Sequence, residues 1–467
     1  MIERLAIFGA TGDLTGRYLL PGLAALRAAG YLGDGFQLIA ASREDWTDER
    51  YREHATEWLE RAASNVSAGA RRDVVAATRY QQLDLADIGS VAACLQGTEP
   101  IAVYLALPPS VFPAAISAVR QAGLPSGSRL ALEKPFGENL HDAVELNHQL
   151  AEFLDEREIF RVDHFVAMTT VQTLLGTRLA NRILESLWNS SHIAEIEIIW
   201  EESLALEGRA GYYDGVGALK DMIQNHLLQI LCLVAMEPPI SVTERDLRDR
   251  KVDVLRSVRP LHGTEAAATR RARYTAGQIG GRDIPSYADE EGVDPARGTE
   301  TFAEVRLELD SWRWSGTVFR LRTAKAVAAD RKEVVVHFRP VPHLPIHTPQ
   351  DPAPNLLRFG LEPEDLTLEL TGAGPHARFS LVPLILRARH EPAELPPYGR
   401  LLLDVLTGET ALSIRGDEAE ESWRVLSPVL DAWAKDTVPL AEYPAGSGGP
   451  ARDSGATSAA PVEDGRP

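Results

Sequence analysis

The sequence has little that would indicate a secreted, metal-binding or membrane protein. Only two of its 467 residues are cysteines, Cys94 and Cys232, which suggests neither a disulfide framework nor a metal site. The longest strongly apolar run, residues 227–236, is too short to cross a bilayer. The N-terminus enters an expected strand at once, without a signal-peptide pattern. These absences predict a cytoplasmic protein with no membrane association and no metal ion.

Positive charge is also scarce. Lysine and arginine together number 48, against 67 aspartates and glutamates, which gives a formal net charge of -19. A nucleic-acid-binding surface needs clustered basic side chains, so this balance argues against a nucleic acid as a partner. The charge balance does not exclude an anionic small molecule as a substrate, because a few well-placed cations suffice to bind one phosphate.

The chain length and the order of the expected elements indicate two domains. In the first part, short apolar strands alternate with helical patterns, which predicts a Rossmann-like, doubly wound parallel sheet. The expected strands are 5–8, 36–41, 101–107 and 129–132, and the first expected helix is 19–29.

The second part has a different pattern, with strands that follow one another and few helices between them. Long helical patterns at 170–188 and 215–236 flank a strand at 192–200. Further strands are expected at 302–309, 315–322, 333–338, 365–370 and 376–382. Such a run predicts a mainly antiparallel sheet in a larger α+β domain. We therefore expect a dinucleotide-binding domain at 1–160, a substrate-binding and oligomerisation domain at 161–442, and a disordered tail, rich in Gly, Ser, Ala and Pro, at 443–467.

A glycine pair follows the first expected strand, in the segment Gly9-Ala10-Thr11-Gly12-Asp13-Leu14. Glycines there let the backbone turn sharply and approach a pyrophosphate, and the helix that follows offers free N–H groups. The spacing is Gly-x-x-Gly rather than Gly-x-Gly-x-x-Gly, so a plain turn is the alternative. The position after the first strand favours cofactor binding by Gly9, Thr11, Gly12, Asp13 and Leu14.

The residues that end the second expected strand, Ser42-Arg43-Glu44, bear on the choice of nucleotide. An arginine at this point can accept the 2′-phosphate of NADP, whereas an acidic residue binds the ribose hydroxyls of NAD. Arg43 favours NADP, although a solvated arginine is an equal alternative and Glu44 could pair with Arg43 or repel the phosphate. Lys134, which ends another parallel strand, points into the same crevice by this reasoning.

Two histidine-containing segments stand out in the second domain, Arg161-Val162-Asp163-His164-Phe165 and Asp221-Met222-Ile223-Gln224-Asn225-His226. A lone helical histidine belongs more often to a core than to an active site. Here a carboxylate adjoins one histidine and polar residues precede the other. A neutral imidazole held by a carboxylate suits proton removal from a sugar hydroxyl near pH 7.

These segments resemble the glucose-6-phosphate dehydrogenase family. The resemblance includes the glycine segment, Glu-Lys-Pro-Phe-Gly at 133–137, both histidine segments, Glu-Gly-Arg at 207–209 and Arg-Thr-Ala-Lys at 322–325. It continues to Tyr-Pro-Ala-Gly-Ser at 443–447 and covers nearly the whole chain in family order. It implies NADP-dependent oxidation of glucose 6-phosphate at C1 and a homodimer or homotetramer formed through the second domain's sheet.

The resemblance also implies residue roles. His226 matches the general base and Asp163 the carboxylate that orients it. The other matching positions contact the substrate or the cofactor. They are His164 at the substrate phosphate, Lys134 between substrate and cofactor, Glu202 and Asp221 at sugar hydroxyls, Lys325 at the substrate, and Asp84 with Leu85 at the cofactor. The peptide bond between Lys134 and Pro135 is expected to be cis.

Three positions depart from the family pattern. Phe165 and Met168 stand where the family has a tyrosine and a lysine at the phosphate, and Asp330 stands where a second cation is common. Arg331 or Lys332 could replace that cation if the loop is shifted. Two alternatives therefore stay open beside glucose 6-phosphate oxidation. One is a dehydrogenase of an unphosphorylated or different sugar, and the other is a catalytically silent paralogue.

Overall fold

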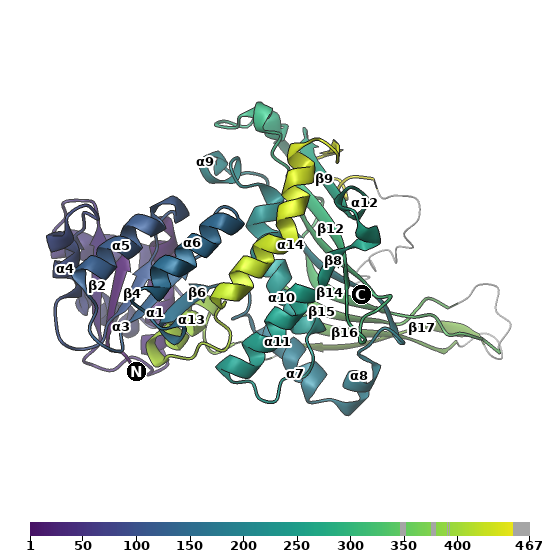
Figure 1. Ribbon diagram of the computed structural model, residues 1–467, viewed down its shortest axis with the longest axis horizontal. Coiled ribbons are helices and arrows are strands. Elements are labelled where there is room, and N and C mark those ends of the chain that lie inside the picture. The colour runs from purple at the N-terminus through teal and green to yellow at the C-terminus, as the bar shows by residue number, and fades with distance from the viewer. Residues whose placement is uncertain (346–351, 375–379, 390, 392, 452–467) are drawn as a thin grey trace.

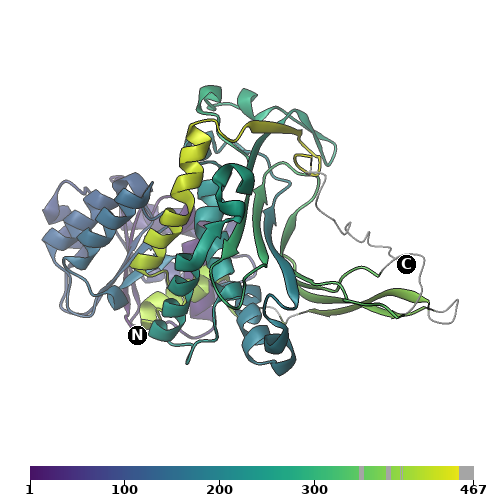
Figure 2. The ribbon, with the colours of Figure 1, turned by 45° about the vertical axis from the view of Figure 1, so that its right-hand side comes forward.

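The computed structural model describes residues 1–345, 352–374, 380–389, 391 and 393–451, and it contains two large β-sheets (Figure 1). The first sheet lies in the N-terminal part of the chain, and the second lies beyond residue 190. The long helix α14 (Gly416–Ala434) runs between the two parts, which Figure 2 shows from another side.

All six strands of the first sheet are parallel, in the order β3-β2-β1-β4-β5-β6. The strands are β1 (Arg4–Phe8), β2 (Gln37–Ser42), β3 (Thr78–Gln82), β4 (Ala102–Leu105), β5 (Arg129–Glu133) and β6 (Ile159–Val162). The helices that connect them are α1 (Leu20–Ala28), α2 (Asp48–Ala62), α3 (Ala68–Ala76), α4 (Ile88–Leu95), α5 (Phe112–Ala122) and α6 (Leu140–Ala151).

Strand β1 explains why both faces of this sheet carry helices. Leu5 and Ile7 point into one hydrophobic cluster, whereas Ala6 and Phe8 point into the other. A strand that is apolar on both faces must be covered on both, which is the condition for a doubly wound parallel sheet. Strand order reverses between β1 and β4, so the ligand crevice is expected at the carboxyl ends of these two strands.

The second sheet follows the path β17-β16-β15-β14-β7-β13-β12-β9-β18, with β8 paired to β12. Its strands are β7 (Ile193–Glu201), β8 (Val258–Pro260), β9 (Thr269–Thr275), β12 (Phe302–Leu309), β13 (Val318–Ala324), β14 (Arg331–Phe338), β15 (Leu356–Leu361), β16 (Glu364–Ala373), β17 (Leu381–Arg389) and β18 (Leu440–Pro444). Pairing is antiparallel except for β13 with β7 and β18 with β9. Helices α7 (Thr169–Leu179), α10 (Leu228–Ala235), α11 (Glu244–Ser257) and α14 share its hydrophobic core.

The predicted fold class is confirmed, and the elements differ from prediction in detail. The helical pattern at 170–188 is two helices, α7 and α8 (Arg182–Leu187), and the pattern at 215–236 begins with a turn and a π-helix, η4 (Leu219–Leu227). Several strands named above have no counterpart among the expected ranges, namely β3, β6, β8, β9, β15 and β18. The strand expected at 376–382 overlaps β17 only at residues 381 and 382, and residues 376–379 lie outside the described part of the chain.

The predicted disordered tail is wrong for its first residues. Tyr443 lies in β18, is buried, and donates a hydrogen bond from its hydroxyl to the carbonyl of Lys325 at 2.6 Å. Composition suggested disorder here, but pairing with β9 and burial of Tyr443 and Ala445 hold this segment in the fold. Residues 452–467 lie outside the described part of the chain.

A late segment of the chain also returns to the first domain. Helix α13 (Pro397–Thr407) packs against α1, and its residues Leu402 and Leu406 belong to the core of the first sheet. A division by residue number alone places this helix in the second domain. No helix in the described ranges is long and apolar enough to cross a membrane.

Candidate active site

The glycine turn lies at the carboxyl end of β1, beside the end of β4. Gly9 has a φ of +91°, and a Cβ there would lie 2.1 Å from the carbonyl oxygen of Ala106, so only glycine fits. The N–H of Gly12 donates to the carbonyl of Gly9 at 3.1 Å, and a continuous helix then runs from Asp13, through the π-helical stretch η1 (Thr15–Leu19), into α1. This close approach and the helix N-terminus fit a dinucleotide pyrophosphate.

Other predicted cofactor residues lie along the same edge of the sheet. Thr11 donates its backbone N–H to the Ser42 hydroxyl at 3.1 Å, and its own hydroxyl donates to the Glu44 carboxylate at 3.0 Å. The Arg43 side chain is exposed and makes no ion pair or hydrogen bond with a described residue. The structure therefore leaves Arg43 available at the end of β2, while Glu44 is engaged with the glycine turn.

The remaining predicted cofactor contacts are Asp13, Leu14, Asp84 and Leu85. Asp13 is exposed and pairs with Arg17 at 3.2 Å, and Leu14 follows it in the first turn of the helix. Asp84 and Leu85 follow β3, and the Asp84 carboxylate accepts the N–H of Ala86 at 2.9 Å. All four residues lie at the carboxyl edge of the parallel sheet.

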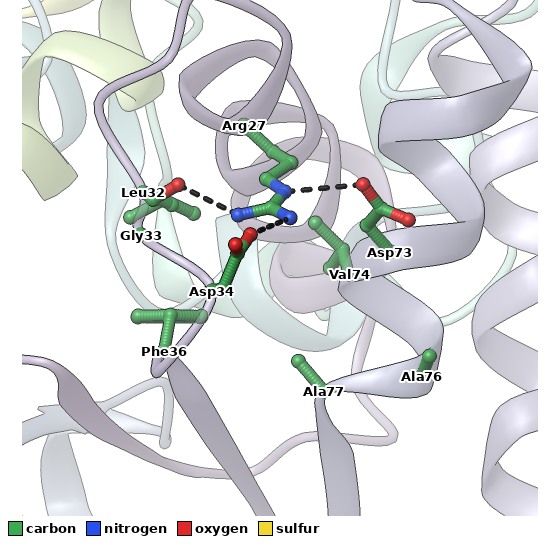
Figure 3. Close-up of a pocket in the computed structure, with 9 residues that line it drawn as sticks. All are labelled: Arg27, Leu32, Gly33, Asp34, Phe36, Asp73, Val74, Ala76 and Ala77. Atoms are coloured by element: carbon green, nitrogen blue, oxygen red, sulfur yellow. Dashed lines mark hydrogen bonds and ion pairs between the residues drawn. The ribbon is translucent and has the colours of Figure 1, made fainter.

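A cavity at the opposite edge of this sheet is filled by a side chain that holds the fold together and is not a cofactor site (Figure 3). It lies at the amino ends of β2 and β3, away from the glycine turn. Arg27 fills its centre, donating to the carbonyl of Leu32 at 2.8 Å and to Asp34 and Asp73 at 2.7 and 3.1 Å. Since ligands of doubly wound sheets bind at the carboxyl ends of strands, this cavity is not the dinucleotide site.

Asp163 and His226 form a buried pair where the two domains meet. Asp163 follows β6 of the first sheet. His226 lies in the π-helix η4, which packs against the second sheet. Nδ1 of His226 is 2.6 Å from Oδ1 of Asp163, and neither side chain is more than 1% exposed. The same carboxylate oxygen accepts the N–H of Phe165 at 2.9 Å, and the Phe165 ring stacks on the imidazole at a centroid distance of 3.8 Å. The imidazole is therefore held both in its plane and across its face.

The electrostatics of the pair favour a neutral imidazole beside an ionised carboxylate. Burial opposes ionisation of Asp163, but the adjacent His226 outweighs it and holds the pKa of that carboxyl well below its usual range. Burial lowers the pKa of His226, with Asp163 acting in the opposite direction. An ionised Asp163 accepts the proton on Nδ1, so Nε2 carries a lone pair. Such an imidazole can act as a general base at neutral pH.

Lys134 joins the end of β5 to the helix that carries His226. Its ammonium donates to the carboxylate and to the backbone carbonyl of Asp221, each at 2.9 Å. Burial opposes the charge on Lys134, but the Asp221 carboxylate outweighs burial and raises the pKa of the lysine. Burial also opposes ionisation of Asp221, but Lys134 outweighs it and lowers the pKa of that carboxyl to about 2. The Lys134–Pro135 peptide bond is cis, as the resemblance implies.

Glu202 and Lys325 form the third pair, at one end of the second sheet. They follow β7 and β13, which run parallel with Glu201 opposite Ala324, so the next residues lie side by side. Lys325 donates to the Glu202 carboxylate at 2.9 Å, and the indole of Trp200 donates to its other oxygen at 3.2 Å. The structure thus brings the predicted sugar-binding residues together in oppositely charged pairs.

His164 lies beside the pair of Asp163 and His226, with its ring 5.0 Å from that of His226. Burial, and then the neighbouring His226, lower its pKa to about 3, so His164 is neutral in the free protein. Asp163, His164 and His226 each bring one possible metal-ligand atom within 4.8 Å of the others. Within this group, Oδ1 of Asp163 and Nδ1 of His226 are already joined by a hydrogen bond.

Met168 does not lie on a helix with His164, although the two positions are four residues apart in the sequence, the spacing of one helical turn. Residues 164–167 form a turn, and α7 begins only after Met168, whose backbone is extended at φ −67° and ψ 138°. The Met168 side chain packs, half-buried, against the core of the second domain.

The loop between β13 and β14 and the first two residues of β14 do not present a free cation. The Asp330 carboxylate accepts the backbone N–H and the hydroxyl of Ser203, both at 2.7 Å. Lys332 pairs with Asp330 at 3.3 Å and with Glu362 at 2.6 Å. Arg331 pairs with Glu333, so both possible replacements are already compensated by carboxylates.

The sequence did not point to three aromatic residues at this site. Tyr212 donates its hydroxyl to Asp221 at 3.4 Å, Trp200 holds Glu202, and Tyr398 of α13 stacks on His164 with centroids 5.4 Å apart. Glu202 follows Trp200 by two residues, which is the only local signal. Tyr398 reaches the site through tertiary packing of α13.

Comparison with known proteins agrees with this geometry. Residues 6–173 match the family model "Glucose-6-phosphate dehydrogenase, NAD binding domain", and residues 175–460 match "Glucose-6-phosphate dehydrogenase, C-terminal domain". The chain belongs to the glucose-6-phosphate dehydrogenase family. The recognition made from the sequence is therefore confirmed, and the first domain is that of a pyridine-nucleotide-dependent dehydrogenase.

Curated relatives in this family match the chain over almost its full length. It is 36% identical to the glucose-6-phosphate 1-dehydrogenase of Zymomonas mobilis, with 96% of each chain covered. It is 37% identical to that of Mycolicibacterium smegmatis, with 95% and 93% covered.

Solved structures of glucose-6-phosphate dehydrogenases also match. One, described as a complex with its substrate glucose-6-phosphate, superposes with a TM-score of 0.86 at 28% identity, covering 96% of this chain and 95% of that one. The enzyme from Mycobacterium avium superposes with a TM-score of 0.85 at 32% identity, with the same coverage.

Proposed function

We propose that this member of the glucose-6-phosphate dehydrogenase family oxidises D-glucose 6-phosphate at C1 to 6-phospho-D-glucono-1,5-lactone with reduction of NADP. Such a reaction belongs to the oxidative pentose phosphate pathway. The observation that carries the proposal is the buried pair of Asp163 and His226, 2.6 Å apart, where the dinucleotide-binding domain meets the second domain. An intact pair argues against a catalytically silent paralogue.

In this mechanism His226 accepts the proton of the C1 hydroxyl at Nε2, and the negative charge of Asp163 stabilises the imidazolium that forms. The bound nicotinamide supplies the acceptor for the hydride that leaves C1. Burial of both side chains keeps water from competing for the base. Phe165 and the Asp163 hydrogen bond fix the ring, so no reorientation is needed during proton transfer.

The charged pairs around the base position the sugar. Asp221 and Glu202 would accept hydrogen bonds from ring hydroxyls, while Lys134 and Lys325 hold these carboxylates in place. His164 would lie toward the phosphate and donate one hydrogen bond as a neutral imidazole.

NADP is proposed as the nucleotide because Arg43 is exposed and uncompensated at the end of β2, where a 2′-phosphate would lie. The same edge carries Gly9, Thr11, Gly12, Asp13 and Leu14 around the proposed pyrophosphate site. The Glu44 carboxylate accepts a hydrogen bond from the Thr11 hydroxyl and is therefore engaged with the glycine turn. Since an acidic residue is the usual ligand of the ribose 2′-hydroxyl in NAD, this engagement supports binding of a 2′-phosphate by Arg43.

We also propose a cytoplasmic homodimer or homotetramer. Strand β17 ends the second sheet and exposes apolar side chains, among them Leu384 at 47% and Leu386 at 51%. An exposed apolar edge strand is a surface that another copy can cover. The two cysteines are buried free thiols, which suits a reducing compartment.

The test is a steady-state assay of the purified protein with NADP and glucose 6-phosphate, following the absorbance of the reduced nicotinamide. Lactone formation would be checked by product analysis. We expect turnover that depends on both reactants. Absence of nucleotide reduction with any hexose or hexose phosphate would contradict the proposal and favour the silent paralogue.

A further inference from the structure

Ser42, Arg43 and Glu44, here called the Arg43 turn, close strand β2 and are held by side chains of the neighbouring strand β3. The hydroxyl of Tyr80 in β3 lies 2.6 Å from the carbonyl oxygen of Glu44 and 3.2 Å from that of Ser42. Gln82, two residues further along β3, donates its side-chain amide to the carbonyl of Arg43 at 3.1 Å. Three consecutive carbonyls of the turn therefore accept hydrogen bonds from side chains of one strand.

Tyr80 is itself fixed by the first helix that follows the turn, α2. Its ring stacks on that of Tyr51 at a centroid distance of 5.4 Å, and its backbone N–H donates to the Asp48 carboxylate at 2.6 Å. The side chain is buried, and burial raises the pKa of its phenol to about 12. The hydroxyl therefore keeps its one proton, which the two carbonyls share, with the closer one, that of Glu44, as the main acceptor.

The two stacked tyrosines hold different parts of the nucleotide site. Tyr51 is fully buried and donates its hydroxyl to the carbonyl of Ala10, in the glycine turn, at 3.2 Å. The glycine turn is proposed to bind the pyrophosphate, which NAD and NADP have in common. The Arg43 turn is proposed to bind the 2′-phosphate, which only NADP carries. Tyr51 thus supports the shared part of the site, and Tyr80 supports the part that distinguishes the two nucleotides.

Arg43 combines an anchored backbone with an unpaired side chain. Its carbonyl accepts from Gln82, while its exposed guanidinium makes no ion pair or hydrogen bond with a described residue. Without such ties the turn would sample several conformations, and binding would have to order it at a cost in affinity. Ties that fix the backbone before the nucleotide arrives remove this cost. They strengthen the contact of Arg43 with a 2′-phosphate and leave the binding of NAD, which lacks that phosphate, unchanged.

We propose that Tyr80, assisted by Gln82, is a positioning residue for nucleotide choice, which holds the Arg43 turn so that Arg43 meets the 2′-phosphate of NADP. This inference rests on the proposed function, because it takes Arg43 as the ligand of that phosphate. In this role Tyr80 acts through Arg43 and not by contact with the nucleotide. Its loss should therefore change the preference for NADP over NAD rather than catalysis as such.

The test measures kcat/KM with NADP and with NAD, at saturating glucose 6-phosphate, for variants of the full chain. Tyr80→Phe keeps the ring and removes the hydroxyl, and it should lower the NADP/NAD ratio about threefold to tenfold, the effect of one lost hydrogen bond. Gln82→Ala should lower the ratio at least about twofold. Because the Gln82 side chain is exposed, this second variant should fold normally, and it decides the question if Tyr80→Phe fails to fold.

Each variant has a matched control. Tyr51→Phe removes the hydroxyl of the stacked partner and should change kcat/KM for both nucleotides by the same factor, so that their ratio stays within about twofold. Gln81→Ala removes a neighbouring amide that donates to the carbonyl of Gln82 at 3.2 Å and not to the turn, so the ratio should not change. In the Arg43→Ala background, Tyr80→Phe should have no further effect on the ratio, because the side chain that it positions is gone.

The outcomes separate this inference from the function on which it rests. If Arg43→Ala lowers the ratio but Tyr80→Phe and Gln82→Ala leave it within about twofold, the inference is overturned and the proposed function stands. The same holds if Tyr80→Phe lowers the ratio equally with and without the arginine. If Arg43→Ala itself leaves the ratio unchanged, the proposed nucleotide ligand is wrong and the inference fails with it. If neither nucleotide is reduced, the proposed function itself fails.

Discussion

Replacing Asp163 by asparagine removes the charge beside the base while keeping the shape of the side chain. Asp163 accepts one hydrogen bond from His226 at 2.6 Å and one from the Phe165 N–H at 2.9 Å, in a fully buried setting. A hydrogen bond to a charged group contributes about 1.5–3 kcal/mol. Loss of that contribution in the transition state lowers kcat roughly 10- to 150-fold. Binding of either reactant should change little.

The pH profile gives this prediction its second readout. Burial lowers the pKa of His226 and Asp163 raises it, so removal of the charge leaves burial less opposed. The acid limb of kcat/KM should therefore move to lower pH in Asp163→Asn, while the plateau falls. The matched control is Asp253→Asn, on the surface of α11, where the lost partner is Arg250 at 3.0 Å. Normal turnover, or an acid limb moved to higher pH, would refute the reasoning.

The other predictions concern the nucleotide, the phosphate and the core. Arg43→Ala should lower the NADP/NAD ratio of kcat/KM about tenfold or more, and an unchanged ratio would show that Arg43 is not the 2′-phosphate ligand. Met168→Lys should lower KM for glucose 6-phosphate about tenfold with little change in kcat, because phosphate binding is remote from C1. If steady-state kinetics show no change in KM, residue 168 lies away from the phosphate. Lys251→Met should destabilise the protein by about 3–5 kcal/mol in denaturant unfolding, since it leaves the Glu418 carboxylate buried without its 2.7 Å partner. A loss below about 1 kcal/mol would mean that water or another cation compensates Glu418.

Local sequence signals predicted the parts of the site that lie next to strand ends. The glycine turn, Arg43, Lys134 and Asp163 all follow strands of a parallel sheet, and a parallel sheet brings its carboxyl ends to one edge. Periodicity predicted the strand before each of these residues, apart from the short β6 before Asp163, so their approximate placement followed from chain order.

The pairing of charges could not be predicted in the same way. Lys325 meets Glu202 because β13 runs parallel to β7 in a sheet that is mainly antiparallel, and Lys134 meets Asp221 across the domain boundary. Both contacts depend on tertiary register. Resemblance to the family identified the residues, whereas their mutual compensation became visible only in the structure.

Composition misled at the end of the chain. A stretch rich in glycine, serine, alanine and proline usually cannot bury enough apolar surface to stay ordered. Here one aromatic residue, Tyr443 of β18, pairs beside β9, and its buried hydroxyl forms hydrogen bonds with Lys325 and Thr301. Tyr398 is a similar case, because nothing near it in the sequence indicates that α13 returns to the active site.

The most direct test of the account is the turnover of His226→Asn. With saturating NADP and glucose 6-phosphate, kcat should fall roughly a hundredfold to ten-thousandfold, the usual contribution of a general base. KM values and the far-ultraviolet circular dichroism should stay close to those of the wild type, and His141→Asn, an exposed histidine of α6, should turn over normally. If folded His226→Asn retains near-normal kcat, the base lies elsewhere and the central claim is contradicted.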